Sequence, residues 1–335
     1  MDGSERAGGH MDSGSRPMRI GVLGAARIVK NALIDPARLV DGVEVEAIAA
    51  RDHDRARRYA ARHGIRFAHP SYQELLADPV LDAVYIPLPA ALHARWAVAA
   101  IEADKHVLCE KPFTSNTAAA EEIAAAAVGS DCVVMEAYHS HHHPLQARLR
   151  DILASGELGR IVTARATFCV PIPPGRDIRW NLALGGGGLL DVGYYPVRQL
   201  RDLFGSAPEV TAARAWQRGG IDRLITATLR FESGVEGHIV SSIWSRHLLS
   251  AALEVTGSDG RMRVSWPYHP HLRGRISIRA RHGSRTETPE RRSTYAYQLE
   301  AFRDARTTGV GPAEAVAQMR TLDAIYRAAG MSPRP

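Results

Sequence analysis

Cysteine is scarce in this sequence, and long apolar runs are absent. The three cysteines, Cys109, Cys132 and Cys169, lack C-x-x-C spacing and offer neither a disulfide framework nor a zinc site. Sparse cysteine is typical of a reducing compartment, so we expect a cytoplasmic protein. No stretch approaches the ~18 consecutive apolar residues of a membrane helix, which predicts no membrane partner. Residues 1–17 lack the apolar core of a secretory signal, and we expect a disordered leader there.

Lysine is also rare, although the chain is basic. Only Lys30, Lys105 and Lys111 are lysines among 42 basic residues. An ammonium group gives up a proton far more readily than a guanidinium group, so a retained lysine is a candidate for proton chemistry. Lys30 and Lys105 lie in ordinary helix or turn contexts, which leaves Lys111. The net charge is +6, but the arginines are scattered along the chain and mostly alternate with Asp, Glu or Ala. We therefore expect a solvated basic surface and no nucleic-acid partner.

The 335 residues suit two domains. Over 18–139, short apolar runs alternate with helical segments, which predicts a Rossmann domain, a doubly wound parallel sheet that binds a dinucleotide. Over 140–335, longer alternating strands predict an α+β domain for substrate binding and oligomerisation, built on a large, mostly antiparallel open sheet; the fold class is α/β. Strands are expected at 18–23, 44–50, 83–86, 106–109, 132–136, 161–169, 210–217, 224–231, 235–242, 252–256 and 260–264. Helices are expected up to Leu33 and at 55–63, 72–77, 92–103, 116–127, 185–204, 295–307 and 313–329.

The first strand ends at Gly24 and opens directly into a helix. This arrangement can aim backbone N–H groups and the helix dipole at a pyrophosphate. The match to G-x-G-x-x-G is incomplete, because Ala26 and Val29 stand at the second and third glycine positions. By spacing alone, a turn without a ligand is as well supported as a cofactor loop. The predicted cofactor loop consists of Gly24, Ala25, Ala26, Arg27 and Ile28.

The second strand ends in Arg51. An acidic residue at this position accepts from the ribose 2′-hydroxyl of NAD, whereas arginine accommodates the 2′-phosphate of NADP. We therefore expect NADP, with NAD left open by Asp52. The alternative is a surface arginine paired with Asp52 or Asp54.

The fourth strand closes with Glu110, Lys111 and Pro112. In an α/β sheet, ligands bind in the crevice beyond the carboxyl ends of the strands, so Lys111 occupies a suitable position for chemistry. The end of the third strand should bring further cofactor-binding residues to the same crevice. These are Leu88, Pro89 and His93, although a histidine at this place more often only starts a helix.

A glycine run at 185–188 precedes Asp191 and Tyr195. Glycine lets the backbone approach a ligand closely, and residues spaced i and i+4 share one face of a helix. One polar face can therefore point into the crevice. Taken alone, the cluster favours the alternative of a flexible hinge and a tyrosine that bonds within the core.

Together, the run from Lys105 to Pro112 and the glycine-rich cluster resemble the glucose–fructose oxidoreductase and inositol dehydrogenase family, Gfo/Idh/MocA. The resemblance extends from residue 18 to about residue 330. It implies hydride transfer between a nicotinamide and a sugar, polyol or diol, with Lys111 and Tyr195 handling the proton. Asp191 would orient that pair or bind a substrate hydroxyl. Many members carry histidine where Tyr195 stands, and tyrosine resembles the branch of dihydrodiol dehydrogenase and NADP-linked xylose dehydrogenase.

The resemblance also suggests a cis peptide between Lys111 and Pro112. We expect the Lys111 ammonium to favour the phenolate of Tyr195. Two alternatives stay open: a ketoreductase of a nucleotide-activated deoxysugar, and a non-catalytic NADP-binding regulator on the same fold. Further substrate contacts are predicted for Tyr138, Arg179 and Trp180, although a packed aromatic and a surface arginine are equally well supported for the last two.

Four histidines at 139 and 141–143 resemble a metal cluster. Adjacent side chains in an extended segment point to opposite sides, and no carboxylate or cysteine follows at ligand spacing. We therefore predict no metal, and expect these histidines at the domain junction. The open sheet of the second domain has too few helices to cover both faces, which predicts a homodimer or homotetramer through it.

Overall fold

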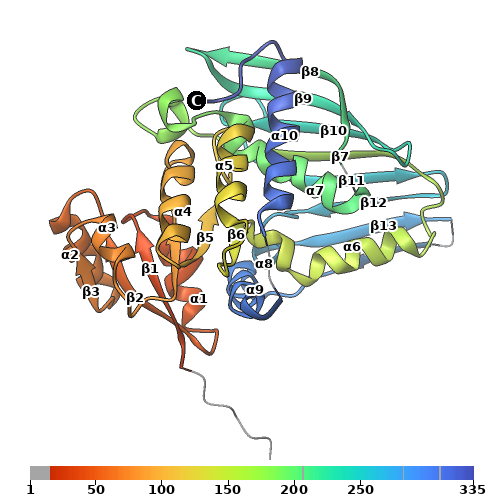
Figure 1. Ribbon diagram of the computed structural model, residues 1–335. Coiled ribbons are helices and arrows are strands. Elements are labelled where there is room, and N and C mark those ends of the chain that lie inside the picture. Colours follow the sequence, from red (N-terminus) through yellow and green to blue (C-terminus); the bar gives the residue numbers. More distant parts are fainter. Residues whose placement is uncertain (1–15, 206, 282, 309–310) are drawn as a thin grey trace, which may run out of the picture.

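The computed structural model describes residues 16–205, 207–281, 283–308 and 311–335, which form two sheets lying side by side (Figure 1). Nearly all of the expected leader, residues 1–15, lies outside the described residues. Arg16, the first described residue, donates to both carboxylate oxygens of Asp82 at 2.6 and 2.8 Å. Among the described residues, no helix combines the length and the apolar character needed to cross a membrane.

The first sheet has six parallel strands in the order β3-β2-β1-β4-β5-β6. The chain reverses its direction of growth between β1 and β4, which opens a crevice at their carboxyl ends. All five expected strands are present, and the three-residue β3, too short to show an alternating pattern, was not predicted. The strands are β1 (Met18–Leu23), β2 (Val43–Ala49), β3 (Phe67–His69), β4 (Ala83–Ile86), β5 (His106–Glu110) and β6 (Val134–Ala137).

Helices connect these strands close to their expected positions. The first helical segment continues through Ala37, past its expected end at Leu33. The second begins before Arg55, because the Asp52 carboxylate caps it by accepting from the Arg55 N–H at 2.7 Å. It ends, as predicted, at Gly64. The segments are η1 (Lys30–Ile34), α1 (Asp35–Ala37), α2 (His53–His63), α3 (Tyr72–Leu76), η2 (Ala90–Leu92), α4 (His93–Glu102) and α5 (Thr117–Ala127).

The second sheet has eight strands in the order β14-β13-β12-β11-β7-β10-β9-β8. All neighbours are antiparallel except β7 and β10, which confirms the mostly antiparallel open sheet. The last two strands were not predicted from their short, arginine-rich sequences. The strands are β7 (Ile161–Cys169), β8 (Glu209–Arg218), β9 (Ile221–Arg230), β10 (Glu236–Ser242), β11 (Ser250–Gly257), β12 (Gly260–Ser265), β13 (Arg275–Ala280) and β14 (Gly283–Glu287).

Three helices, α6 (Pro144–Ala154), α7 (Tyr194–Phe204) and α10 (Ala313–Ala328), cover one face of this sheet (Figure 1). In contrast, α9 (Thr294–Thr308) returns to the first sheet, where Leu299 and Phe302 are buried in the same core cluster as Val29 and Leu33. Helix α9, near the C-terminal end of the chain, therefore contributes to the core of the first sheet. The short segments are η3 (His139–His142), η4 (Ile178–Trp180), η5 (Leu182–Leu184), η6 (Leu189–Gly193) and α8 (Pro270–Arg273).

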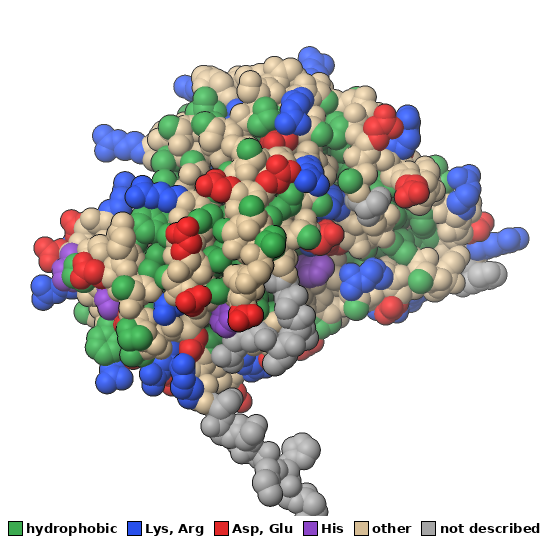
Figure 2. Space-filling view, viewed as in Figure 1, with side chains coloured by type: hydrophobic (Ala, Val, Ile, Leu, Met, Phe, Trp, Pro, Cys, Tyr) green, Lys and Arg blue, Asp and Glu red, His purple; other side chains and the backbone are tan. Residues whose placement is uncertain are grey.

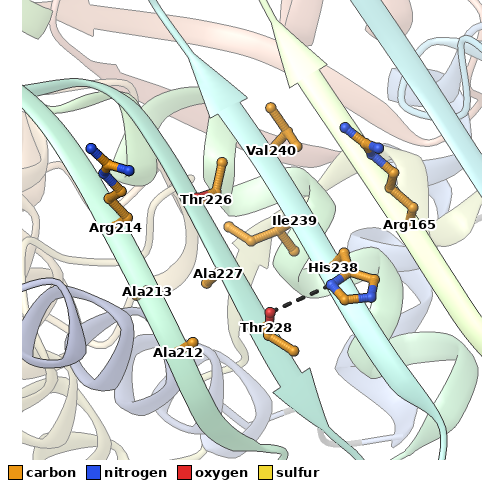
Figure 3. A pocket seen from close by; sticks show the side chains of 10 residues that line it. All are labelled: Arg165, Ala212, Ala213, Arg214, Thr226, Ala227, Thr228, His238, Ile239 and Val240. Atoms are coloured by element: carbon orange, nitrogen blue, oxygen red, sulfur yellow. Dashed lines mark hydrogen bonds between the residues drawn. The ribbon is translucent and has the colours of Figure 1, made fainter.

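The opposite face of the eight-stranded sheet carries polar side chains, as Figure 3 shows for β7 to β10. Arg165, Arg214 and Thr228 border a shallow hollow of about 330 Å³, and Thr228 lies 3.4 Å from the ring of His238. No site residue predicted above borders this hollow. On the face of the molecule seen in Figure 2, basic and acidic side chains are interspersed.

Candidate active site

A small hollow of about 80 Å³ lies at the carboxyl ends of β4 and β5, against the glycine-rich run. Three separate segments border it, so folding brings together residues that are as far apart in the sequence as Leu88 and Asp191. Seven of the predicted site residues border it: Leu88, Pro89, His93, Lys111, Pro112, Arg179 and Asp191.

Lys111 occupies the centre of the arrangement. Its ammonium donates to the Asp191 carboxylate and to the Asp191 carbonyl, both at 3.1 Å. The same nitrogen lies 4.8 Å from the centre of the Tyr195 ring, within the range of a cation–π contact. The peptide bond between Lys111 and Pro112 is cis, as the resemblance suggested.

Asp191 holds two cations at once. Its second carboxylate oxygen accepts from Nε of Arg179 at 2.5 Å, and Arg179 also bonds to Asp177. Burial acts to raise the pKa of the Asp191 carboxyl, but the charges of Lys111 and Arg179 outweigh burial and hold this pKa below its ordinary value. The Asp191 carboxylate is therefore ionised and fixes the position of the lysine.

Tyr195 begins the second turn of the same helical segment and is only 5% exposed. Its hydroxyl lies 3.3 Å from Nε2 of His139. The expectation of a favoured phenolate is wrong for this structure, since burial and the charges of Glu110 and Asp191 raise the pKa of Tyr195 well above 10. The phenol therefore keeps its proton and is suited to donate it.

The glycine run is tightly packed, so the alternative of a flexible hinge does not describe it. A Cβ on Gly186 would lie 2.6 Å from the Asn181 carbonyl oxygen, and one on Gly188 would lie 2.9 Å from the Asp222 carbonyl oxygen. Backbone approaches this close require glycine. The first turn is held by the buried Asp222 carboxylate, which accepts from the Leu189 N–H at 2.6 Å.

His93 and Glu110 make hydrogen bonds that hold the loop of Lys111 in place. The two ring nitrogens of His93 lie 2.7 Å from the Leu88 carbonyl and 3.0 Å from the Pro112 carbonyl. Burial lowers the pKa of His93 and raises that of Glu110, whose carboxylate accepts from the Tyr85 hydroxyl at 2.6 Å. These side chains are engaged by the protein and connect the loops after β4 and β5.

The predicted cofactor loop turns at Gly24, whose φ of 118° lies outside the range that side chains favour. The Ala25 carbonyl accepts from the Arg55 guanidinium at 2.8 Å, and the Ala26 carbonyl from the Tyr59 hydroxyl at 3.3 Å. Sequence reasoning missed Arg55. Its position one helical turn after Arg51, at the start of α2, was the available signal.

Three predicted substrate residues, Tyr195, Trp180 and Tyr138, do not border the hollow at Lys111. The indole N–H of Trp180 donates to the Ile172 carbonyl at 3.2 Å, and the ring packs against the core. Tyr138 borders a separate hollow of about 240 Å³ beside Glu136 and Arg198, although its ring centre lies 5.7 Å from that of Tyr195.

The four neighbouring histidines have different partners. His139 contacts Tyr195 and Thr294, whereas His141 pairs with Asp202 at 3.0 Å. His143 caps α6 by accepting from the Leu145 N–H at 3.0 Å. Within the described part of the chain, no group of three or more histidine, cysteine or acidic residues could hold a metal ion.

Comparison with protein-family models gives two matches. The model of an oxidoreductase family with an NAD-binding Rossmann fold, GFO_IDH_MocA, matches residues 18–138. The model of the GFO/IDH/MocA C-terminal domain matches residues 146–263. The two matches together cover most of the chain.

Individual relatives agree with this result. A D-xylose 1-dehydrogenase (NADP⁺) from Haloferax volcanii is 37% identical over 323 residues, covering 93% of this chain and 97% of the relative. A dTDP-3,4-didehydro-2,6-dideoxy-α-D-glucose 3-reductase from Saccharopolyspora spinosa is 37% identical over 79% of each chain. Among solved structures, a 3-ketoreductase from Actinomadura kijaniata in complex with NADP and TDP-benzene has a TM-score of 0.87, with 30% identity over 93% of this chain and 98% of the other.

Proposed function

This chain belongs to the GFO/IDH/MocA oxidoreductase family, and we propose that it transfers hydride between NADP and a hydroxyl or carbonyl group of a sugar, polyol or diol. The observation that carries the proposal is the position of the Lys111 ammonium, between the Asp191 carboxylate and the Tyr195 ring at the carboxyl edge of the parallel sheet. Lysine and tyrosine converge there from different domains on the place where such folds react their ligands.

The residues present suit a bound dinucleotide phosphate. Gly24 turns the chain at positive φ a few residues before the first helical segment, and the basic residues Arg51 and Arg55 stand just after β2 and at the start of α2. We assign the pyrophosphate to the backbone of residues 24–28 and the 2′-phosphate to Arg51, aided by Arg55. Leu88, Pro89 and Pro112 would border the nicotinamide end. When bound, the reduced cofactor supplies hydride.

In the direction of carbonyl reduction, the protein has two tasks at the substrate oxygen. Lys111 stabilises the negative charge that develops on this oxygen, because a fixed ammonium in a water-poor site acts strongly. Tyr195 donates the proton, which its raised pKa keeps on the phenol. Asp191 holds Lys111 in place, and Arg179 shares that carboxylate at the rim, where a substrate hydroxyl would meet it. Oxidation of an alcohol runs the same steps in reverse.

A second candidate is the reduction of a keto group on a nucleotide-activated deoxysugar. It is favoured by the similarity to the deoxysugar 3-reductase and to the ketoreductase solved with TDP-benzene. The two candidates share the same chemistry and differ in the part of the substrate that extends beyond the ring.

The decisive experiment compares cofactors and then substrates. NADPH and NADH are titrated by fluorescence, with tighter binding of NADPH expected. A panel of pentoses, hexoses and diols with NADP, and a dTDP-linked ketosugar with NADPH, is followed by nicotinamide absorbance. Turnover of free sugars or diols supports the first candidate, and turnover of only the nucleotide sugar supports the second. Cofactor binding without turnover of any compound would contradict both and favour a regulatory protein.

We propose that residues 18–139 form the domain that binds the dinucleotide. We propose that residues 140–335 form the domain that binds substrate and joins the subunits of a homo-oligomer. The polar face around Thr228 and Arg214 supports the second assignment, because it lies on the side of the sheet away from α6, α7 and α10 (Figure 3). Light scattering should show a dimer or tetramer that dissociates in a Thr228→Glu, Arg214→Glu variant. A monomeric wild-type protein would contradict it. The free thiols of Cys109, Cys132 and Cys169 support a cytoplasmic setting, which cell fractionation would test.

A further inference from the structure

A series of uncharged groups leads away from the Tyr195 hydroxyl. The hydroxyl lies 3.3 Å from Nε2 of His139, and Nδ1 of His139 lies 2.8 Å from the Thr294 hydroxyl. That hydroxyl lies in turn 3.4 Å from Nδ1 of His271. The four side chains come from α7, η3, α9 and α8, so only the folded protein brings them into line.

The series runs from the interior toward the surface. His139 and Thr294 are 1% and 0% exposed, whereas His271 is only half-buried. Burial lowers the pKa of His139 well below 6.5, so its ring is neutral at physiological pH. A neutral imidazole has one N–H donor and one acceptor nitrogen, and a hydroxyl can also donate and accept. Each member can therefore receive a proton on one side while it releases one on the other.

The surroundings of His139 favour this use over a charged pair. The ring centres of His269 and Tyr295 lie 4.9 and 4.2 Å from that of His139, and burial together with the charge of Lys111 opposes its protonation. Burial lowers the pKa of His269 to about 4, so this neighbour is neutral as well. Phe168 and Tyr268 pack their rings against Tyr195 and separate it from bulk water.

We propose that His139 and Thr294 form a proton relay that returns a proton to Tyr195 from His271 at the edge of the protein. The relay rests on the proposed function and adds to it the route by which the proton is replaced. No residue of the relay was assigned a role by the sequence analysis above.

In the direction of reduction, the relay supplies the proton that Tyr195 gives up in each turnover. Two electrons reach the carbonyl carbon as hydride from the reduced nicotinamide, and the Tyr195 O–H bond breaks as its proton goes to the carbonyl oxygen. The phenolate then takes the proton from Nε2 of His139, and Nδ1 of His139 takes the proton of the Thr294 hydroxyl. Thr294 takes a proton from Nδ1 of His271 while Nε2 of His271 takes one from water, and both imidazole rings return to their starting tautomers before the next turnover. One solvent proton is consumed for each hydride transferred.

A Thr294→Val variant breaks the relay and nearly preserves the shape of the side chain. Because Tyr195 is protonated before the reaction starts, the first turnover should keep its wild-type rate. Later turnovers should slow by about 10-fold, and their solvent deuterium isotope effect should rise. Stopped-flow absorbance of NADPH separates the two phases. Thr321→Val is the matched control, since this buried hydroxyl bonds to the carbonyl of Ala317 in its own helix.

Two outcomes would overturn the relay. Unchanged later turnovers would show that the hydroxyl carries no proton, and an equal loss in both phases would show a packing role only. A His139→Ala variant gives a second test, in which added imidazole, but not pyrrole, should restore the later turnovers. Absence of rescue together with a normal Thr294→Val variant leaves the proposed function intact and removes the relay. Failure of the wild-type protein to oxidise NADPH with any carbonyl in the panel would instead reject the proposed function.

Discussion

The side chains around Tyr195 form two groups that differ in charge. On the Lys111 side, two cations and the carboxylates of Asp191 and Asp177 form a connected ionic group. On the His139 side, the side chains are aromatic or imidazole groups whose burial disfavours charge. The difference suggests a division of labour. Fixed charge on one side can stabilise an oxyanion, and neutral groups on the other can move a proton without leaving a charge behind.

The largest effect is expected from removing the positive charge of Lys111. Lys111→Met should lower turnover by ~100-fold or more while NADPH binding stays near the wild-type value, because the ammonium acts on the reacting oxygen. Steady-state kinetics and fluorescence titration measure the two quantities. Lys30→Met is the matched control, since Lys30 pairs with Asp35 at the surface and away from the hollow. Equal, small effects of both substitutions would remove Lys111 from the chemistry.

A smaller effect is expected when the ionic group is disrupted without removing the lysine. Asp191→Asn leaves Lys111 and Arg179 facing each other without a carboxylate between them. Turnover should fall by about 10-fold, and the free energy of unfolding by about 2 kcal/mol, which is less than for a fully buried pair because the site is partly exposed. Urea unfolding measures the second quantity. Asp35→Asn, at an exposed pair, should change it by less than about 1 kcal/mol, and an equal loss in both variants would contradict the buried ionic group.

The buried, neutral histidines should make the free energy of unfolding depend on pH. Burial lowers the pKa values of His139 and His269 in the folded protein, so the unfolded chain binds more protons below pH ~6.5. The free energy of unfolding should therefore fall as the pH drops from 7 to 5.5, by about 1.4 kcal/mol per pH unit for each such histidine below pH ~6.5. His139→Gln should reduce this slope, and His247→Gln, at an exposed position, should not. A slope unchanged in both variants would argue against a neutral His139.

The last prediction concerns Arg51, which is proposed to bind the 2′-phosphate and is not part of the ionic group around Asp191. Arg51→Ala should weaken NADPH binding by about 10-fold and leave NADH binding nearly unchanged, the scale of one charge-assisted hydrogen bond. Fluorescence titration with both cofactors measures it. Arg57→Ala serves as the control, since Arg57 is exposed on α2 and pairs with Asp54. Equal loss for both cofactors would mean that Arg51 does not read the phosphate.

Local pattern predicted much of the fold and part of the site. Lys111 was found because a strand end fixes where a side chain lies, and Asp191 because helical spacing relates it to Tyr195. The strands β13 and β14 and the return of α9 to the first core were missed, since their pairing partners are distant in the sequence.

The pKa shifts in the site could not be predicted from local sequence pattern either. The sign of the shift in the pKa of Tyr195 was predicted wrongly, because it depends on burial and on Glu110 as well as on the neighbouring lysine. The partners of His139 likewise come from segments more than 100 positions away, at Thr294 and His269.

Tyr195 is proposed as the proton donor, and Tyr195→Phe tests this role directly. The substitution removes one hydroxyl and leaves Lys111, Asp191 and Arg179 in place. In a single-turnover measurement with NADPH and the preferred carbonyl substrate, we predict a fall in the rate of hydride transfer by ~100-fold with unchanged NADPH binding. A rate within about two-fold of the wild-type value would contradict the assignment of Tyr195.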